Sequence, residues 1–187
     1  MPDFFAVLQS RRTVRAYREE PISEAELKEL IEWAILAPTG VGSQPWAFTV
    51  VTQREVMERL NARIKEVLVA ANPPWFQGGM RDAVTDPAYD IFYHAPALIA
   101  ISGDRQAPTP MIDCQLAAEN LFLAAQAKGL GTCYMGFLLF GAADPEVRSL
   151  LRIPDSHDFV AAAIVGHPAT QPEDPPKRNP PKIEWVR

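Results

Sequence analysis

The segment 111–128 constrains the fold most, because it is predicted to be a long helix that is apolar on most sides. Gly129 follows it directly, at a place where glycine commonly ends a helix. A helix that is apolar on most sides must be buried, with other elements packed around it. The sequence therefore predicts a central helix enclosed by the rest of the domain. Its apolar residues include Ile112, Leu116, Ala117, Leu121, Phe122, Ala124 and Ala125.

Helices and strands alternate irregularly around this segment. Apolar periodicity predicts further helices over 4–10, 23–35, 52–69 and 144–151. Short apolar runs predict strands over 46–51, 97–102, 132–134 and 159–165. Because these elements do not alternate strictly, the pattern favours an α+β domain over a doubly wound parallel sheet.

Three helix starts carry capping residues. Asp3 can cap the first helix. Ser23 with Glu26 forms a capping box, and Thr52 with Glu55 has the same spacing. We therefore expect helices to begin directly after Asp3, Ser23 and Thr52.

Length and charge narrow the class of protein. The 187 residues suit one domain over 1–187, and the net charge of -5 disfavours a nucleic-acid binder. No apolar run approaches the roughly 20 residues of a membrane span. The first residues carry their charges after the apolar stretch, the reverse of a secretory signal, so we expect the cytoplasm. Two cysteines and three scattered histidines lack a zinc-binding pattern, so no metal is expected.

The chain offers no self-contained catalytic motif. Gly129 and Gly131 resemble the start of a dinucleotide-binding loop, but they follow a helix instead of a strand. Ser43 lacks the frame of a nucleophile elbow. If the protein is an enzyme, a cofactor is expected to carry the chemistry.

A basic arm follows the first helix in this acidic protein. Arg11, Arg12, Arg15 and Arg18 lie within eight residues, and Thr13 adds a hydroxyl group. Guanidinium groups are planar bidentate donors that suit a phosphate. The spacing alone equally fits a solvated surface strand held by salt bridges, and that is the commoner case.

A loop rich in glycine lies between the predicted helix 23–35 and the strand 46–51. Its glycines allow a backbone to approach a ligand closely, and Thr39, Ser43 and Gln44 supply hydrogen-bonding groups. The alternative is a simple helix-to-strand turn.

The segment 72–94 is predicted to be irregular and is long for a loop in a compact domain. Such loops often act as lids or binding segments, whereas its aromatic residues could equally cover the core. These residues are Trp75, Phe76, Tyr89, Phe92 and Tyr93.

Taken in order, several segments resemble the FMN-dependent nitroreductase family over nearly the whole chain. They read RRTVRAY, LIEWAILAPTGVGSQPWAFTVV, APALIAIS, DCQLAAENLFLAAQAKGLGTCYMGF and FVAAAIVGHPA. The loop APTGVGSQPW after an arginine-rich arm is the most specific of them. The resemblance implies an α+β fold with a central, mostly antiparallel sheet flanked by helices. It also implies a homodimer with FMN at the subunit interface.

The resemblance also implies which residues bind the flavin phosphate. By position, Arg11, Arg12 and Thr13 would hold the ribityl phosphate. Lys177 and Arg178 would return to that phosphate from the C-terminal segment.

Other positions would contact the flavin ring. Arg15 would face its pyrimidine end, and Met135 and Gly136 would present backbone near N5 and O4. The other subunit would contribute Pro38, Thr39, Gly40 and Gln44. The sequence departs from the family at Gly42, where an asparagine is usual, so one side-chain hydrogen bond is expected to be missing.

The implied activity is a ping-pong oxidoreduction, with NADH or NADPH as electron donor and a nitroaromatic, quinone or similar electrophile as acceptor. Alternatives within the fold are flavin destruction, dehalogenation, dehydrogenation or a flavin-binding sensor without turnover. An interaction domain whose arginines bind an acidic partner is the alternative outside it.

The last stretch, 167–187, is rich in the chain's 18 prolines and has the composition of a linker. In this family context we expect it to be an ordered arm that extends onto the partner subunit, since proline lowers the entropy lost on docking. Near its end, apolar and polar residues alternate in part, as in a strand that is added to a sheet edge. The apolar residues are Ile183, Trp185 and Val186, and the polar one between them is Glu184.

Overall fold

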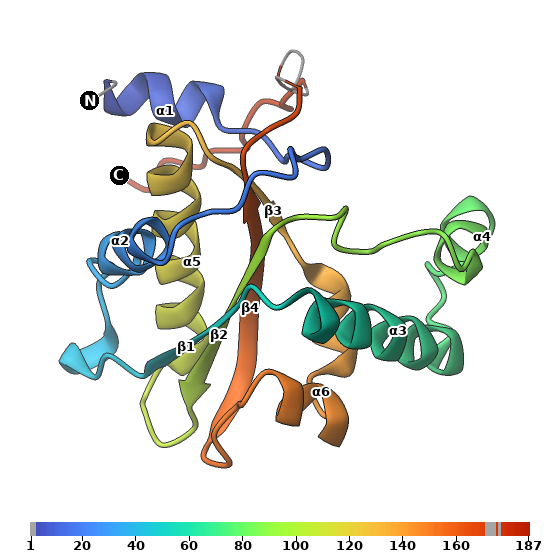
Figure 1. The fold of residues 1–187 in the computed structure, drawn as a ribbon. Coiled ribbons are helices and arrows are strands. Elements are labelled where there is room, and N and C mark those ends of the chain that lie inside the picture. Colours follow the sequence, from blue (N-terminus) through green and yellow to red (C-terminus); the bar gives the residue numbers. More distant parts are fainter. Residues whose placement is uncertain (1–2, 171–174, 176) are drawn as a thin grey trace.

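In the computed structural model, which describes residues 3–170, 175 and 177–187, an antiparallel sheet lies between two layers of helices (Figure 1). The sheet order is β1-β2-β4-β3, and every neighbouring pair is antiparallel. The strands are β1 (Trp46–Val51), β2 (Ala97–Asp104), β3 (Gly131–Tyr134) and β4 (His157–Gly166). The α+β class with a mostly antiparallel sheet is confirmed.

Helices cover both faces of this sheet. One face carries α2 and α5, with α1 beside α5, and the other carries α3, α4 and α6 (Figure 1). The helices are α1 (Phe4–Ser10), α2 (Glu24–Ala34), α3 (Arg54–Ala71), α4 (Gly79–Thr85), α5 (Pro110–Ala127) and α6 (Pro145–Leu150), with 3-10 turns η1 (Gly40–Gly42) and η2 (Gly136–Gly141). Among the described residues, none of the helices combines the length and the apolar character needed to cross a membrane.

The alternation of side chains along β2 divides the core into two clusters. Leu98 and Ala100 pack with α3, whereas Ile99 and Ile101 pack with α2 and α5. All four side chains are buried. The sheet is therefore the rigid centre of the fold, and segments bound to its edge strands are held in fixed positions.

Helix α5 is central, as its sequence predicts, but it is not enclosed on all sides. Leu121 and Ala125 are fully buried against the sheet and α2. In contrast, Met111, Ile112 and Leu116 are 62%, 60% and 42% exposed. The prediction of a fully enclosed helix is wrong at its first turns, where an apolar strip faces outward.

The capping predictions have different outcomes. Ser23 Oγ accepts from the backbone N–H of Glu26, whose carboxylate accepts in return from the Ser23 N–H, so this capping box is confirmed. Asp3 stands at the cap position of α1 without a side-chain capping bond. The capping box at Thr52 is wrong, because α3 begins one residue later, with Gln53 at its cap.

The prediction that 72–94 is irregular is wrong at its centre, where α4 forms. This helix has seven residues, too few to show an apolar period, and Val84 is its buried residue. Gly78 precedes it with a φ of 55°, a conformation that favours glycine.

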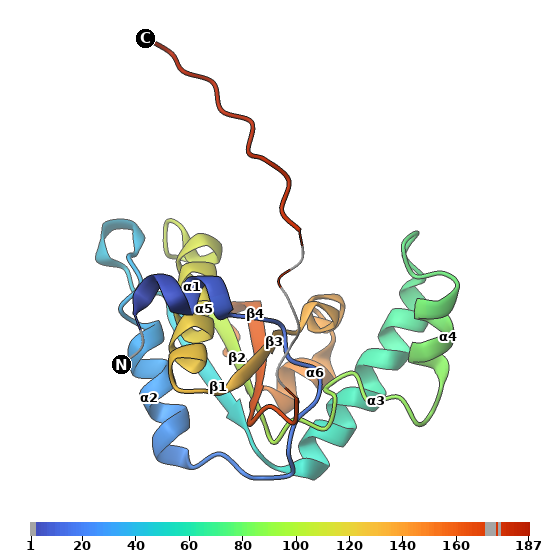
Figure 2. The ribbon, with the colours of Figure 1, turned by 90° about the horizontal axis from the view of Figure 1, so that it is seen from above.

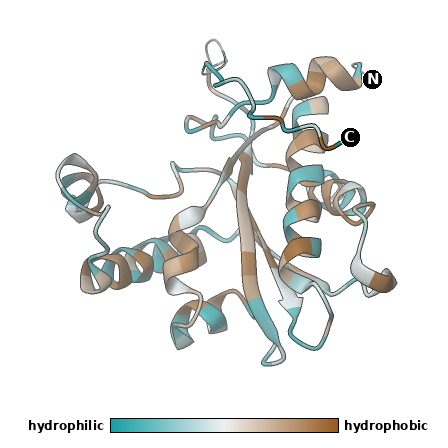
Figure 3. Ribbon diagram, turned by 180° about the vertical axis from the view of Figure 1, so that it is seen from behind, coloured by the Kyte–Doolittle hydropathy of each residue, from teal (hydrophilic) through white to brown (hydrophobic). Residues whose placement is uncertain are grey.

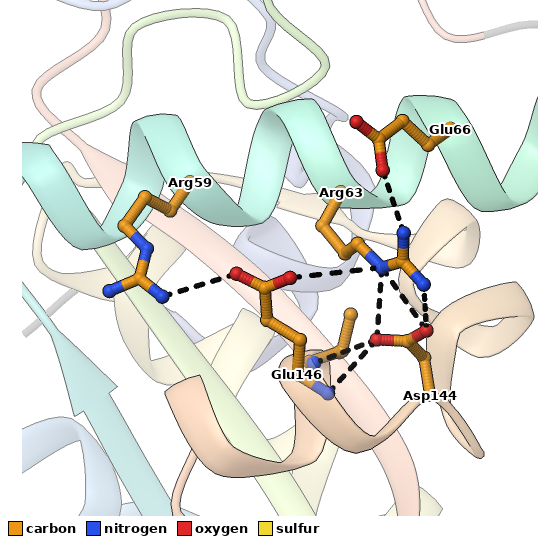
Figure 4. Close-up of polar contacts among 6 residues, drawn as sticks. Arg59, Arg63, Glu66, Asp144 and Glu146 are labelled. Carbon is orange, nitrogen blue, oxygen red and sulfur yellow. Dashed lines mark hydrogen bonds and ion pairs between the residues drawn. The ribbon is translucent and has the colours of Figure 1, made fainter.

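An ion-pair network joins α3 to the start of α6 (Figure 4). Arg63 Nη2 lies 2.6 Å from Asp144 Oδ2, and Arg59 Nη2 lies 3.1 Å from Glu146 Oε1. Asp144 also caps α6 by accepting from the backbone N–H groups of Glu146 and Val147 at 3.1 Å. The hydrogen bond from Arg63 holds the pKa of Asp144 below its usual range.

Replacing Asp144 by asparagine is expected to lower the free energy of unfolding by about 1–2 kcal/mol at neutral pH, because a charged capping and pairing group is lost. Because the pKa of Asp144 is lower in the folded state, its carboxylate stabilises the fold fully above the unfolded-state pKa of about 4. That stabilisation is lost as the pH falls through the lower folded-state pKa. The difference between wild type and Asp144→Asn should therefore shrink below about pH 4 in urea unfolding series. A constant difference at every pH would contradict this. Glu66→Gln, which alters an exposed partner of Arg63, is the control and should change stability by less than about 0.5 kcal/mol.

Candidate functional site

The basic arm, residues 11–18, lies along the edge strand β3. Thr13 pairs with Thr132 in a parallel bridge, and the Val14 N–H donates to the Thr132 carbonyl at 2.9 Å. Gly131 is required at this contact, since a Cβ there would lie 2.8 Å from the Val14 side chain. The arm is thus held by its backbone, which leaves its charged side chains available for other contacts.

Most of these arginines have no acidic partner. Arg18 pairs with Glu20 at 3.4 Å, but no carboxylate of the described residues lies within 4.0 Å of a guanidinium nitrogen of Arg11, Arg12 or Arg15. The interpretation of the arm as a salt-bridged surface strand therefore does not describe these three side chains.

Arg12 also has a donor without an acceptor. Its Nη1 donates to the carbonyls of Gln9 and Arg11, at 2.7 Å each, at the end of α1. Its Nε is buried and has no hydrogen-bond partner among the described residues. Buried donors are nearly always paired in folded proteins, so this atom fits an acceptor supplied by a bound anion.

The end of β3 lies on the same edge of the sheet. The Met135 N–H donates to the Ala162 carbonyl at 2.8 Å, and its carbonyl accepts from Leu138, so both backbone groups of Met135 are occupied. Gly136 is half-buried, and a Cβ built on it would meet no atom within 4 Å. Of this predicted pair, Gly136 is the one open to a ligand.

The glycine-rich loop is fixed by a carboxylate that the sequence analysis missed. Asp113 on α5 is 2% exposed. It accepts from the Gly40 N–H at 3.2 Å, from Ser43 Oγ at 3.2 Å and from Thr109 Oγ1 at 2.9 Å. The signal in the sequence was an acidic residue in the first turn of a mostly apolar helix.

The same loop has an uncommon backbone. Val41, Gly42 and Gln44 have φ angles of 50°, 72° and 46°, in the left-handed region that favours glycine. Such a backbone persists only where surrounding contacts fix it, and Asp113 supplies them.

Within one chain, the predicted residues fall into separate groups. The loop with Pro38, Thr39, Gly40 and Gln44 lies near α2 and the start of α5, away from the arm in both Figure 1 and Figure 2. Lys177 and Arg178 are exposed in a segment without helix or strand that extends away from the domain (Figure 2). Residues 171–174 and 176 of the predicted arm 167–187 lie outside the described residues. Of the predicted site residues that the structure describes, those that a single chain places along the β3 edge of the sheet are Arg11, Arg12, Thr13, Arg15, Met135 and Gly136.

The aromatic residues of 72–94 divide between the two alternatives. Phe76 and Phe92 are buried in the core. Trp75 is 49% exposed and stacks on Phe137 with ring centroids 6.4 Å apart. The core interpretation holds for the two phenylalanines, whereas Trp75 faces outward.

The sequence matches the model of the nitroreductase family over residues 8–167. The chain belongs to the nitroreductase family. A nitroreductase from Bacteroides fragilis, solved with bound FMN, is 29% identical and superposes with a TM-score of 0.85 over 99% of this chain and 100% of that one. The family assignment and its fold are thereby confirmed.

Two relatives of known activity show how varied the family's reactions are. The nitrobenzene nitroreductase of Ectopseudomonas oleovorans is 26% identical over 86% of this chain and 84% of its own length. The 5,6-dimethylbenzimidazole synthase of Rhodospirillum rubrum is 31% identical over 87% of this chain and 81% of its own. Family membership alone therefore leaves more than one reaction open.

Proposed function

We propose that this nitroreductase-family protein is an FMN-dependent oxidoreductase that takes electrons from NADH or NADPH and reduces a nitroaromatic, quinone or similar electrophile in a ping-pong cycle. The observation that carries the proposal is the arm beside β3. Three guanidinium groups there have no carboxylate partner among the described residues, and one has a buried donor without an acceptor.

The residues present fit FMN. Arg11, Arg12 and Thr13 would bind the phosphate, to which guanidinium groups donate charge-assisted hydrogen bonds. Arg15 would stabilise negative charge at the pyrimidine end of the ring. Gly136 would offer its N–H at the N5 and O4 edge. Bound FMN would supply the redox chemistry, which agrees with the lack of a nucleophile motif in the sequence.

We propose that the functional unit is a homodimer. Large apolar side chains are exposed on α1 and on the first turns of α5, and the ribbons of both helices carry hydrophobic stretches in Figure 3. They are Phe4, Phe5, Leu8, Met111, Ile112 and Leu116, between 42% and 67% exposed. Large apolar side chains exposed in this number mark an interaction site, and a second copy would cover them while bringing its glycine-rich loop to the flavin.

The C-terminal segment would complete the dimer. Ile183 and Trp185 are 61% and 76% exposed, and β1 has a strand neighbour on one side only within the described residues. The free edge of β1 in the partner is a place where an added strand would gain backbone hydrogen bonds.

Deleting residues 172–187 is therefore expected to weaken both dimerisation and FMN binding by at least about tenfold, since strand contacts and two charged phosphate donors are lost. Sedimentation and fluorescence titration with FMN would measure the two effects. The double variant Lys177→Gln/Arg178→Gln is the control, because it should weaken FMN binding and leave the dimer intact. If the deletion variant dimerises and binds FMN as tightly as wild type, the proposed role of the C-terminal arm is wrong.

The visible spectrum of the purified protein tests the main proposal. We expect flavin absorption bands that bleach when NADH or NADPH is added without oxygen, and that return when an acceptor such as a quinone or nitroaromatic is added. A protein that binds FMN but is reduced by neither nucleotide would contradict the proposed activity. A colourless protein that takes up no added FMN would favour the interaction-domain alternative.

One second activity is favoured by a specific observation, the 31% identity to a 5,6-dimethylbenzimidazole synthase. In that case the flavin itself would be consumed under oxygen. Product analysis after aerobic turnover separates the two activities, because flavin recovered intact together with reduced acceptor supports the oxidoreductase.

A further inference from the structure

Arg15 lies against an aromatic side chain that comes from a distant part of the sequence. Its guanidinium carbon is 5.9 Å from the centre of the Tyr93 ring, within the range of a cation–π contact. Tyr93 Oη lies 3.1 Å from Tyr89 Oη, and the two rings meet edge to face at 6.0 Å. Tyr89 and Tyr93 are half-buried, whereas Arg15 is exposed. The guanidinium therefore rests on a fixed ring and keeps another side open to a ligand.

The backbone that carries Tyr93 is held in an uncommon conformation. Tyr93 and the following His94 have φ angles of 52° and 54°, both in the left-handed region. Asp90 fixes this turn, since its carboxylate accepts from the N–H groups of Phe92 and His94 at 2.9 Å each. Two successive non-glycine residues in this region require such support, and they often occur where a side chain must be aimed.

The same turn leads directly into the central sheet. Pro96 separates Ala95 from β2, and Ala95 is buried in the core cluster. On the other side, the backbone of the arm is bound to β3 through Val14. Both partners of the contact are thus attached to the sheet, so the distance between ring and guanidinium is set by the most rigid part of the fold.

A long arginine side chain otherwise loses rotamer freedom when it binds a ligand. A cation held on an aromatic face is already restricted, and preorganised charge acts more strongly on a ligand than charge that must first be ordered. The described carboxylates offer Arg15 no alternative partner within ion-pair distance. Besides the Cys133 thiol, which also contacts Arg15, Tyr93 is the side chain that lies against the guanidinium and can orient it.

We propose that Tyr93 is a positioning residue whose ring holds the Arg15 guanidinium toward the pyrimidine end of bound FMN, so that reduced flavin is bound more tightly relative to oxidised flavin. This inference rests on the proposed function, because it concerns the same flavin site. It assigns a role to the segment 72–94 that does not require it to move as a lid.

The test compares Tyr93→Leu and Tyr93→Met, which remove the ring, with Tyr93→Phe, which keeps the ring and removes the hydroxyl group. FMN affinity and the two-electron midpoint potential are measured for each. The ring-deficient variants should lose about fivefold in affinity for reduced over oxidised FMN, equal to a potential lowered by about 20 mV. Tyr93→Phe should stay within about twofold of wild type, because the cation–π contact remains.

A double-mutant cycle with Arg15→Ala shows whether Tyr93 acts through Arg15. In the Arg15→Ala background, Tyr93→Leu should cause no further change in the potential. The inference is overturned if the ring-deficient variants keep the wild-type potential, if Tyr93→Phe shifts as much as they do, or if their effect persists without Arg15. If wild type itself fails to bind FMN, the proposed function fails first, which distinguishes the two outcomes.

Discussion

Ile112→Glu is expected to convert the dimer into monomers and to strip the protein of FMN. Ile112 is 60% exposed on α5, within the apolar strip that a second copy would cover. Burying an unpaired carboxylate costs several kcal/mol, and a two-fold interface buries it twice. Because each 1.4 kcal/mol is a factor of ten, the dissociation constant of the dimer should rise by roughly 100-fold or more.

The fold of the single chain should survive this substitution, since the side chain makes little contact with its own core. Far-ultraviolet circular dichroism checks the fold, sedimentation gives the oligomeric state, and flavin fluorescence after gel filtration gives retained FMN. Ala62→Glu introduces the same charge at an exposed position on α3, across the sheet from α5, and should leave the oligomeric state unchanged. An Ile112→Glu protein that remains dimeric and yellow would show that this face is not the interface.

Local signals predicted what depends on local interactions. The capping box at Ser23 requires only residues three positions apart, and the strands follow from short apolar runs bounded by loops. The start of α3 shows the limit of such signals. The spacing of Thr52 and Glu55 selects Thr52 as the cap, yet Gln53 takes that position, and local signals commonly miss helix ends by one residue.

Periodicity counts apolar side chains but does not say what covers them. Leu121 and Leu116 look equivalent in the sequence of α5, yet one is fully buried within the chain and the other is 42% exposed. The difference depends on the second molecule that the strip would contact. A sequence rule calibrated on a single core therefore overestimates burial on any helix that builds an interface.

The parts of the site that the sequence analysis missed are contacts between distant residues. Arg15 was singled out from its neighbours in the arm, but its contact with Tyr93 depends on how the turn after α4 returns to the sheet. Asp113 was missed for the same reason, since Gly40 lies 73 residues away from it in sequence. A family resemblance identifies the positions that contact the ligand. It identifies less readily the residues that act by orienting another residue.

Asp113→Ala is expected to have the largest effect on stability. The buried carboxylate accepts from the Gly40 N–H and from the hydroxyl groups of Ser43 and Thr109. Hydrogen bonds to a charged group contribute about 1.5–3 kcal/mol each, and a donor left unpaired adds to the loss. After allowance for the cost of burying the carboxylate itself, we expect the free energy of unfolding to fall by about 3 kcal/mol.

The left-handed backbone of Val41, Gly42 and Gln44 would then lose its anchor and sample other conformations. If the loop contacts the partner's flavin as proposed, FMN affinity should fall at least about tenfold in the folded dimer, since every 1.4 kcal/mol of lost preorganisation is a factor of ten. Asp113→Asn, which keeps one acceptor oxygen, should show an intermediate loss. Glu119→Ala, at an exposed position on the same helix, should change stability by less than about 0.5 kcal/mol.

Thermal unfolding at fixed protein concentration and FMN titration of the folded variants separate the two effects. A stability loss with unchanged FMN affinity would mean that Asp113 supports the fold while the loop stays away from the flavin. That result would remove Pro38, Thr39, Gly40 and Gln44 from the flavin site together. If stability and FMN affinity both fall in Asp113→Ala, and both are partly restored in Asp113→Asn, the buried carboxylate stabilises its own chain and also holds the loop that contacts the partner's flavin.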